Sequence, residues 1–389
     1  MEPGCTANGC IHVFTRGSHY PEDILAGEAA AGNTVINGII QYAITYVSDG
    51  KEITGTVFVP DTAAPTGGFG VVVMNQFTSG VGASCAPSVG LLAIGVASAT
   101  AMNGLVTIVP DATSYGTAPY GAYLEGKIAG RAALDAARAA FHTTQALGFA
   151  IARKAVIAGL SQGAYSTMAA ATAYPTYANE LEIRGFAAAE PPSNLRSATN
   201  ADLNASAATQ GNLVYDAMRL WSWQGLRSLS GGSLFLPPFD TEAPGWFASD
   251  CIYNGDGSNG TLYNMFYEPV PDGGTPSVPI AASALFTPAF LGYAKTDSWP
   301  ADWTGEYDAS LTVPTGLKLP VLIFEGSADV TVLPADVDAY VAALQAAGVT
   351  VDYRQIPNGT HGTTALSSFT VAQLANDQAV TWITQTLAN

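Results

Sequence analysis

The pentapeptide Gly159-Leu160-Ser161-Gln162-Gly163 places a serine between two glycines in the pattern G-x-S-x-G. It follows a buried, strand-like run at Ala155–Leu160 and opens an alanine-rich, helix-competent stretch at Ser161–Ala173. A sharp strand-to-helix turn there would lift the Ser161 hydroxyl above a sheet, and it requires small residues at 159 and 163. The helix N-terminus would favour negative charge developing on a substrate. An ordinary helix with a capping serine is the alternative.

A serine hydroxyl becomes a good nucleophile only when a base removes its proton. Enzymes with G-x-S-x-G at such a turn carry the serine, the acid and the histidine in that chain order. His361 is the only histidine that follows Ser161, in the polar loop Asn358–Gly362, so it is the candidate base. A solvated loop histidine is the alternative. The other histidines, His12, His19 and His142, precede the serine. We expect His142 to cap its helix or to face solvent on it.

The third member of such a site is a carboxylate that orients the histidine. Asp329 follows a late apolar strand at Val321–Phe324 through a glycine turn, which makes it the preferred candidate. Glu325, four residues earlier, is the rival, although it stands closer to the strand end. The remaining alternative is that Asp329 is an ordinary loop residue with no part in catalysis.

The negative oxygen of a tetrahedral intermediate needs two backbone N–H donors. One comes from the residue after the nucleophile, which is Gln162, and the other from the loop after an early strand. That loop is Asn75–Gly80, directly after the apolar run Val71–Met74.

These residues must be positioned by a sheet, and short apolar strands alternate with helices along most of the chain. This alternation predicts an α/β fold, a mostly parallel sheet with helices on both faces. Residues 1–35 have no clear pattern, and a hairpin with the turn Asp49-Gly50 follows them at Ile39–Val47 and Glu52–Val59. The further predicted strands are Val71–Met74, Leu105–Val109, Ala155–Leu160, Gly185–Ala189, Val321–Phe324 and Val349–Ile356. The further predicted helices are Gly121–Leu147, Ser161–Ala173, Asp338–Ala347 and Phe369–Leu387.

Residues 193–310 break this alternation with Gly-Gly and Pro-Pro pairs. We predict three segments: a hydrolase core over 1–192, an inserted cap or lid over 193–310, and the rest of the core over 311–389. A cap over the carboxyl ends of the strands would lie where open α/β sheets bind ligands. Its aromatic residues would then offer an apolar acyl site, and the alternative is that they build only the insert's own core. The apolar residues concerned are Trp221, Trp223, Trp246, Phe286, Phe290, Leu291, Tyr293, Trp299 and Trp303.

Composition excludes several classes of protein. The chain has 389 residues, of which 48% are hydrophobic and only 12% charged, which is unlike a disordered chain. It has 31 acidic and 14 basic residues, a net charge of −17, which disfavours nucleic acid and anionic membranes as partners. The uncharged run Cys85–Pro110 is long enough to cross a bilayer. Asn103-Gly104 divides it, so we predict a buried helix at Ser88–Met102 and a strand, and no integral membrane association.

Four cysteines, at positions 5, 10, 85 and 251, form an even set without metal-ligand spacing. Three disulfide connectivities are compatible with four cysteines. Glu2, Pro3 and Gly4 follow Met1 without the basic and apolar regions of a signal peptide. The even cysteine count, the few lysines and the many Gly, Ala and Thr residues nevertheless favour an exported protein, extracellular or periplasmic, with two disulfides.

Several segments together resemble the secretory lipases of the Candida antarctica lipase A type, in the α/β-hydrolase superfamily. The resemblance covers about residues 38–192 and 315–388 and leaves the insert aside. The segments that carry it are Thr78-Ser79-Gly80, Cys85-Ala86-Pro87-Ser88, Arg131–Ala140, Gly159–Gly163, Ala187–Pro192, Glu325–Pro334 and His361-Gly362.

The resemblance implies further roles for particular residues. It assigns the second oxyanion N–H to Thr78. Many bacterial relatives have His-Gly where this chain has Gln76-Phe77, so only the backbone donor carries over. The Phe77 side chain would narrow the acyl site or make it more apolar. Cys85 stands where the family uses a disulfide. We therefore expect Cys85 to pair with Cys251, which leaves Cys5 to pair with Cys10 around the turn Asn8-Gly9.

Together these inferences predict a secreted carboxylic-ester hydrolase, a lipase or esterase of lipid degradation, with Ser161, His361 and Asp329 as its triad. No metal or organic cofactor is needed for this chemistry. The substrate would be a neutral, hydrophobic ester, either a small molecule, a lipid or a polyester. A serine peptidase on the same fold and a non-catalytic binding protein are the alternatives. Acyl length, alcohol preference and oligomeric state do not follow from the sequence.

Overall fold

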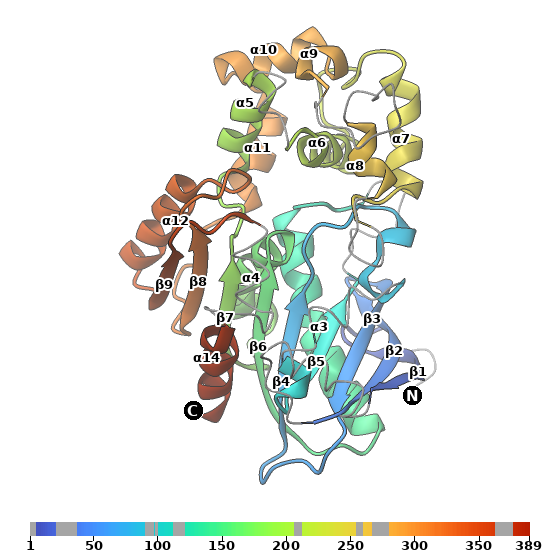
Figure 1. The fold of residues 1–389 in the computed structure, drawn as a ribbon, viewed down its shortest axis with the longest axis vertical. Coiled ribbons are helices and arrows are strands. Elements are labelled where there is room, and N and C mark those ends of the chain that lie inside the picture. Colours follow the sequence, from blue (N-terminus) through green and yellow to red (C-terminus); the bar gives the residue numbers. More distant parts are fainter. Residues whose placement is uncertain are drawn as a thin grey trace.

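The computed structural model describes residues 5–20, 37–89, 97, 100–111, 121–205, 212–253, 260–266, 280–361 and 376–389. Its centre is a nine-stranded sheet in the order β1-β2-β3-β5-β4-β6-β7-β8-β9 (Figure 1). The first three strands and β5 pair antiparallel, and every pair from β5 through β4 to β9 is parallel. The predicted mostly parallel α/β sheet is therefore confirmed. The strands are β1 (Ile11–Tyr20), β2 (Ile39–Ser48), β3 (Lys51–Pro60), β4 (Phe69–Asn75), β5 (Val106–Pro110), β6 (Ile151–Leu160), β7 (Glu182–Ala189), β8 (Val321–Gly326) and β9 (Val351–Ile356).

Helices cover both faces of this sheet. Alternate residues of β4 belong to different cores: Val71 and Val73 pack with the helices of one face, and Val72 and Met74 with those of the other. This is why the strand is apolar at every position from Val71 to Met74. The first face carries α3 (Gly126–Ala146), α4 (Gln162–Tyr177) and α12 (Pro334–Ala346), and the second carries α14 (Asn376–Ala388).

Strand β1 corrects one prediction, because residues 1–35 were expected to be irregular. Its residues pair antiparallel with β2 at the edge of the sheet. An edge strand with a solvent-facing side is held largely by backbone hydrogen bonds, which leave little trace in a hydrophobic pattern. Val13, for example, is 53% exposed. Backbone pairing to β2 therefore decides the structure here.

Several helix boundaries also differ from the predictions. Helix α3 begins at Gly126 rather than Gly121, because the Glu125 side chain caps it by accepting a hydrogen bond from Ile128 N–H. Helix α12 begins earlier than expected, with Pro334 in its first turn. Most of the helix predicted at 88–102 lies outside the described residues, as does the first part of the helix predicted at 369–387.

Between β7 and β8 the chain forms a helical insert, which Figure 1 shows beyond the carboxyl ends of the parallel strands. None of the helices in the described part of the chain is both long and apolar enough to cross a membrane. The helices of the insert are α5 (Leu195–Asn204), α6 (Leu213–Arg227), α7 (Phe239–Ser249), α8 (Thr261–Met265), α9 (Ala282–Leu285), α10 (Pro288–Thr296) and α11 (Ala301–Ser310).

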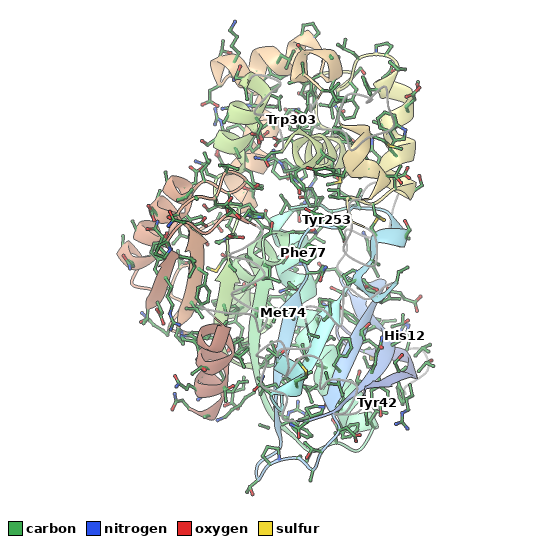
Figure 2. The ribbon with its side chains drawn as sticks, viewed as in Figure 1. His12, Tyr42, Met74, Phe77, Tyr253 and Trp303 are labelled. Carbon is green, nitrogen blue, oxygen red and sulfur yellow. A yellow bond between two sulfur atoms is a disulfide. The ribbon has the colours of Figure 1, made fainter. Side chains whose placement is uncertain are left out.

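The insert has a hydrophobic core of its own. Its large aromatic side chains pack against one another. The ring centroid of Trp303, which is labelled in Figure 2, lies 5.5 Å from that of Phe290 and 5.7 Å from that of Trp299. Both Trp303 and Phe290 are fully buried. Most of these side chains therefore belong to the core that holds the insert together, which is the alternative that the sequence left open. The residues so buried are Trp221, Trp223, Phe286, Phe290, Trp299 and Trp303.

Candidate active site

Ser161 occupies a strained turn between β6 and α4. Its backbone has φ 52° and ψ −114°, a conformation that residues other than glycine rarely adopt. A Cβ atom at Gly163 would lie 2.0 Å from the carbonyl oxygen of Asn75, and one at Gly159 would lie 2.3 Å from the backbone of Gly163. Both glycines of the G-x-S-x-G pattern are therefore required by close backbone approach, as the sequence predicted.

The structure brings Ser161, His361 and Asp329 together, although serine and histidine are 200 residues apart in sequence. The Nε2 atom of His361 lies 2.9 Å from Ser161 Oγ, and its Nδ1 atom lies 2.8 Å from Asp329 Oδ2. A carboxylate can only accept, so Nδ1 carries the proton in this arrangement. The Nε2 lone pair is then directed at the serine hydroxyl, which is the tautomer a general base needs.

Backbone contacts hold Asp329 in place. Its Oδ1 atom accepts hydrogen bonds from the N–H groups of Thr331 (2.7 Å) and Val332 (3.0 Å), and the side chain is buried. The N–H of Ala328 donates to the carbonyl of Gly359 at 2.9 Å, which joins the acid loop to the histidine loop. The carboxylate is therefore oriented before any substrate binds.

Glu325, the rival acid, is unsuited to that role. Burial and the neighbouring Asp329 carboxylate raise the pKa of Glu325 to about 9, so it is neutral at pH 7. Its Oε1 atom accepts a hydrogen bond from Gly326 N–H. Among the described residues, the carboxylates within 4.0 Å of His361 belong to Asp329 and Glu190. The geometry thus favours Asp329 as the partner of the histidine.

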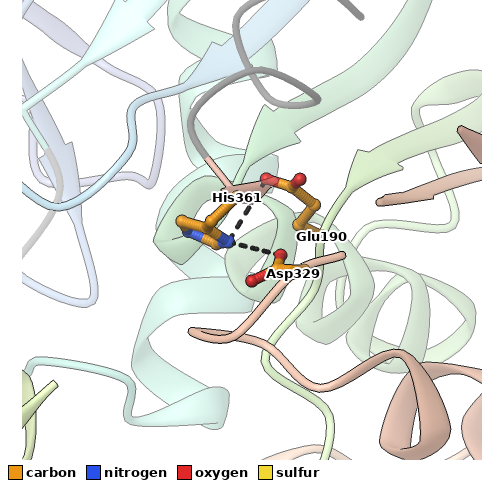
Figure 3. A group of neighbouring side chains, drawn as sticks. All are labelled: Glu190, Asp329 and His361. Carbon is orange, nitrogen blue, oxygen red and sulfur yellow. Dashed lines mark hydrogen bonds and ion pairs between the residues drawn. The ribbon is translucent and has the colours of Figure 1, made fainter. Parts of the chain in front are cut away.

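Glu190 is a residue of this site to which the sequence analysis gave no role. Its Oε2 atom lies 3.3 Å from His361 Nδ1, on the same nitrogen that contacts Asp329 (Figure 3). The sequence feature that could have indicated a role for Glu190 is its position directly after β7, in the segment Ala187–Pro192. Strand β7 lies between the strand that leads to the nucleophile and the strand that leads to the acid.

The same three side chains could also be considered as ligands for a cation. Ligand atoms of Glu190, Asp329 and His361 lie within 4.8 Å of one another, and they form the one such group found in the described part of the chain. A cation there would compete with the Nδ1–H for both carboxylates and would disrupt the tautomer described above. The arrangement suits a proton-shuttling histidine, and the absence of a metal requirement stays a prediction.

The two predicted oxyanion donors lie on segments that meet beside Ser161. Gln162 is the first residue of α4, and Thr78 lies in the loop after β4. The loop follows Asn75, the last residue of β4, whose carbonyl oxygen approaches Gly163 and whose Nδ2 atom donates to Ala158 O at 3.1 Å. Thr78 is buried, and its Oγ1 atom lies 2.9 Å from the hydroxyl of Tyr123. The role of both backbone N–H groups remains a prediction.

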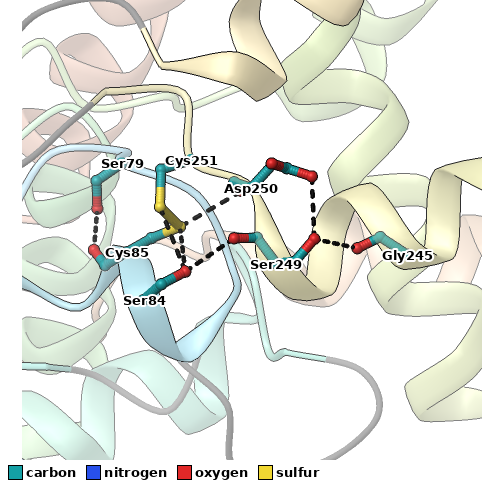
Figure 4. Close-up of a disulfide and its surroundings, with 7 residues drawn as sticks. All are labelled: Ser79, Ser84, Cys85, Gly245, Ser249, Asp250 and Cys251. Carbon is teal, nitrogen blue, oxygen red and sulfur yellow. Dashed lines mark hydrogen bonds between the residues drawn. A yellow bond between two sulfur atoms is a disulfide. The ribbon is translucent and has the colours of Figure 1, made fainter.

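A disulfide fastens this loop to the insert. Cys85 is bonded to Cys251, and Cys5 to Cys10, so both expected pairings are present. Ser79 Oγ donates to the carbonyl of Cys85 at 2.8 Å (Figure 4), and Ile252 N–H donates to the carbonyl of Ser79 at 2.9 Å. The segment next to Thr78 is therefore tied to the insert by both covalent and backbone hydrogen bonds.

Two partly exposed aromatic side chains meet at this loop, Phe77 from the loop itself and Tyr253 from the insert. Phe77 packs edge-on against Tyr253, with ring centroids 5.9 Å apart, at the junction of the sheet and the insert (Figure 2). The hydroxyl of Tyr253 lies 3.4 Å from that of Tyr215 on α6. Both Phe77 and Tyr253 are half-buried, unlike the tryptophans of the insert core. Phe77 therefore remains the candidate for contact with an acyl group.

Comparison with known proteins agrees with this arrangement. Residues 92–211 match the family model described as secretory lipase. No curated protein matches the chain in sequence. The predicted resemblance to secretory lipases is thus confirmed by a family model over part of the chain.

Solved structures extend the likeness to the whole fold. The chain superposes on the rice cell wall degrading esterase LipA from Xanthomonas oryzae with a TM-score of 0.77 at 17% identity, covering 98% of this chain and 99% of that one. A putative hydrolase from Legionella pneumophila gives 0.78 at 17% identity, with 97% and 98% covered. Candida antarctica lipase A in its closed state gives 0.66 at 16%, with 98% and 91% covered. These neighbours establish the α/β-hydrolase fold, and with the family match they support the predicted class, carboxylic-ester hydrolase.

Proposed function

We propose that this protein hydrolyses carboxylic esters through Ser161, His361 and Asp329. The observation that carries the proposal is His361, which contacts Ser161 Oγ through Nε2 at 2.9 Å and Asp329 through Nδ1 at 2.8 Å. A histidine placed between a strained serine and a buried carboxylate can move a proton to and from that serine.

The reaction follows from these contacts. Ser161 Oγ attacks the ester carbonyl carbon while His361 Nε2 takes its proton, and the N–H groups of Thr78 and Gln162 stabilise the resulting oxyanion. The imidazolium then donates its proton to the leaving alcohol, which leaves an acyl group on Ser161. Water, deprotonated by His361, attacks this acyl-enzyme, and the bond between the acyl carbon and Ser161 Oγ breaks as the imidazolium returns its proton to Ser161 Oγ. The carboxylic acid is then released. No step of this cycle needs a metal or an organic cofactor.

We further propose that the substrates are neutral esters with apolar acyl chains. Phe77 and Tyr253 lie half-buried beside the proposed oxyanion loop, and the net charge of −17 disfavours anionic substrates. Each CH₂ group that enters an apolar site contributes about 0.8 kcal/mol, or roughly a fourfold gain in kcat/KM. In a p-nitrophenyl ester series, kcat/KM should therefore rise from acetate to medium acyl chains. A steady decline from acetate upward would limit the protein to small esters.

Secretion is part of the same proposal. The two disulfides and the match to secretory lipases support an oxidising location outside the cytoplasm. We also propose that the helical insert, residues 193–310, acts as a cap between the two parts of the hydrolase core, residues 1–192 and 311–389.

Labelling with a fluorophosphonate probe, together with ester hydrolysis, tests the proposed activity. Ser161→Ala should abolish labelling, and Ser161→Ala and His361→Ala should each lower kcat by roughly 10⁴- to 10⁶-fold. Faster turnover of peptide p-nitroanilides than of esters would instead identify a peptidase. A folded wild-type protein that neither reacts with the probe nor hydrolyses esters would be a binding protein.

A further inference from the structure

The His361 imidazole has two buried carboxylates at one nitrogen. Asp329 Oδ2 and Glu190 Oε2 lie 2.8 Å and 3.3 Å from Nδ1, and neither side chain is exposed to solvent. Buried carboxylates are rare, because the charged form loses its hydration. The imidazolium formed during ester hydrolysis would carry its positive charge beside both carboxylates.

The backbone holds Glu190 at this point. Glu190 has φ 56°, the left-handed region that side-chain-bearing residues seldom occupy. Its N–H donates to the carbonyl of Phe324 on β8 at 2.9 Å, and the preceding residue, Ala189, accepts a hydrogen bond from Ser161 N–H at 2.9 Å. Backbone strain of this kind is retained where surrounding contacts over-determine it, and it is commonest at functional sites. The turn at Ala189 and Glu190 is therefore hydrogen-bonded on one side to Ser161, which follows β6, and on the other side to β8, the strand that leads to Asp329.

Strand order explains why these groups meet. Strands β6, β7 and β8 are neighbours and parallel, so their carboxyl ends lie along one edge of the sheet. Ser161 follows β6, Glu190 follows β7, and Asp329 follows β8. His361 lies in the loop after β9 and reaches back across this row of side chains.

We propose that Glu190 is a second positioning carboxylate for His361, which shares the Nδ1–H with Asp329 and takes it over when Asp329 is removed. This inference rests on the proposed function of His361 as the base. Asp329→Asn introduces an amide that can donate to Nδ1 and so favour the unproductive tautomer, an effect worth about 10⁴-fold where a single carboxylate orients the histidine. An ionised Glu190 carboxylate can only accept, so in that form it keeps the proton on Nδ1.

The test measures kcat for p-nitrophenyl ester hydrolysis in wild type, Glu190→Gln, Asp329→Asn and the double variant. We expect a loss of about tenfold for Glu190→Gln, about 10²-fold for Asp329→Asn, and about 10⁴-fold or more for the double variant. The two effects are then more than additive in free energy. If Glu190→Gln lowers kcat by the same factor in both backgrounds, the two carboxylates act independently and the proposal is wrong.

Glu325→Gln is the matched control. Glu325 is also buried and adjacent to Asp329, but burial and that neighbour raise its pKa to about 9. The substitution exchanges one neutral group for another of similar shape, so kcat should change less than twofold in either background. Thermal unfolding of every variant shows whether a loss of activity comes from a loss of folded protein.

A spectroscopic readout makes the proposal independent of ester hydrolysis. The Nδ1–H of a histidine held by a carboxylate gives a proton resonance far downfield, observable by NMR in the folded protein. The proposal expects this resonance to survive Asp329→Asn and to disappear in the double variant. Its loss in Asp329→Asn alone would overturn the proposal even if the wild type hydrolyses esters. Conversely, its survival with no esterase activity in the wild type would reject the proposed function only.

Discussion

The Cys85–Cys251 disulfide should contribute both to stability and to catalysis. It closes a loop with a sequence separation of 166 residues, whereas Cys5–Cys10 closes one of 5. Loop-closure entropy at 25 °C amounts to about 5 kcal/mol for the long loop and about 2 kcal/mol for the short one. With an unfolding entropy of roughly 2.1 cal/mol/K per residue, these values correspond to losses in Tm of about 6 °C and about 2–3 °C.

The assay compares Cys85→Ser/Cys251→Ser with Cys5→Ser/Cys10→Ser, each as a double substitution that leaves no free thiol. Urea unfolding gives the free energy of unfolding, and thermal scans give Tm. The pair of variants shares the chemical change and differs in loop length and location. Equal losses of stability in the two variants, or a greater loss for the short loop, would refute the loop-closure reasoning.

Activity separates the two disulfides further. The long-range disulfide adjoins Ser79, whose carbonyl accepts the Ile252 N–H and whose neighbour Thr78 is a proposed oxyanion donor. Small displacements of catalytic groups lower the rate of the chemical step. At temperatures where the protein is folded, kcat of Cys85→Ser/Cys251→Ser should therefore fall by about 10- to 100-fold. The Cys5→Ser/Cys10→Ser variant should keep its kcat. An unchanged kcat in the first variant would show that hydrogen bonds alone hold the oxyanion loop.

Three further predictions concern packing and buried charge. Gly163→Ala should abolish activity and lower expression, because the new methyl group would lie 2.0 Å from the carbonyl oxygen of Asn75; normal kcat in a soluble variant would contradict this. Glu325 keeps a proton in the folded state up to a pKa of about 9, but releases it above about pH 4.5 when unfolded, so it lowers stability as pH rises between these values. Glu325→Gln should therefore raise the urea midpoint at pH 8 more than at pH 5, and an equal change at both pH values would count against it. Arg219→Ala should cost about 3–5 kcal/mol of stability, because it leaves its buried ion-pair partner Asp216 without a counter-charge; a change below 1 kcal/mol in urea unfolding would contradict this.

Local chemistry made much of the fold and the candidate site predictable. The buried parts of the strands from β4 to β8, such as Val71–Met74 and Ala155–Leu160, are short and largely apolar runs because both faces of a parallel sheet are covered. The glycines on both sides of Ser161 are recognisable as a five-residue pattern, although the contact that requires Gly163 is with the carbonyl oxygen of Asn75. Chain order then left one histidine for the base. Each of these inferences depends on residue types and their order along the chain, which is why it needed no structure.

The remaining features depend on which segments meet in space. A strand like β1 gains its structure from hydrogen bonds to β2, and no hydrophobic period records them. The aromatic residues of the insert were equally compatible with a binding site and with a core, and their mutual packing places most of them in the core. The sequence favoured Asp329 without excluding Glu325, and it did not single out Glu190, because all three are carboxylates near strand ends. Strand order and loop geometry decide which of them reach His361 Nδ1, and those are properties of the assembled sheet.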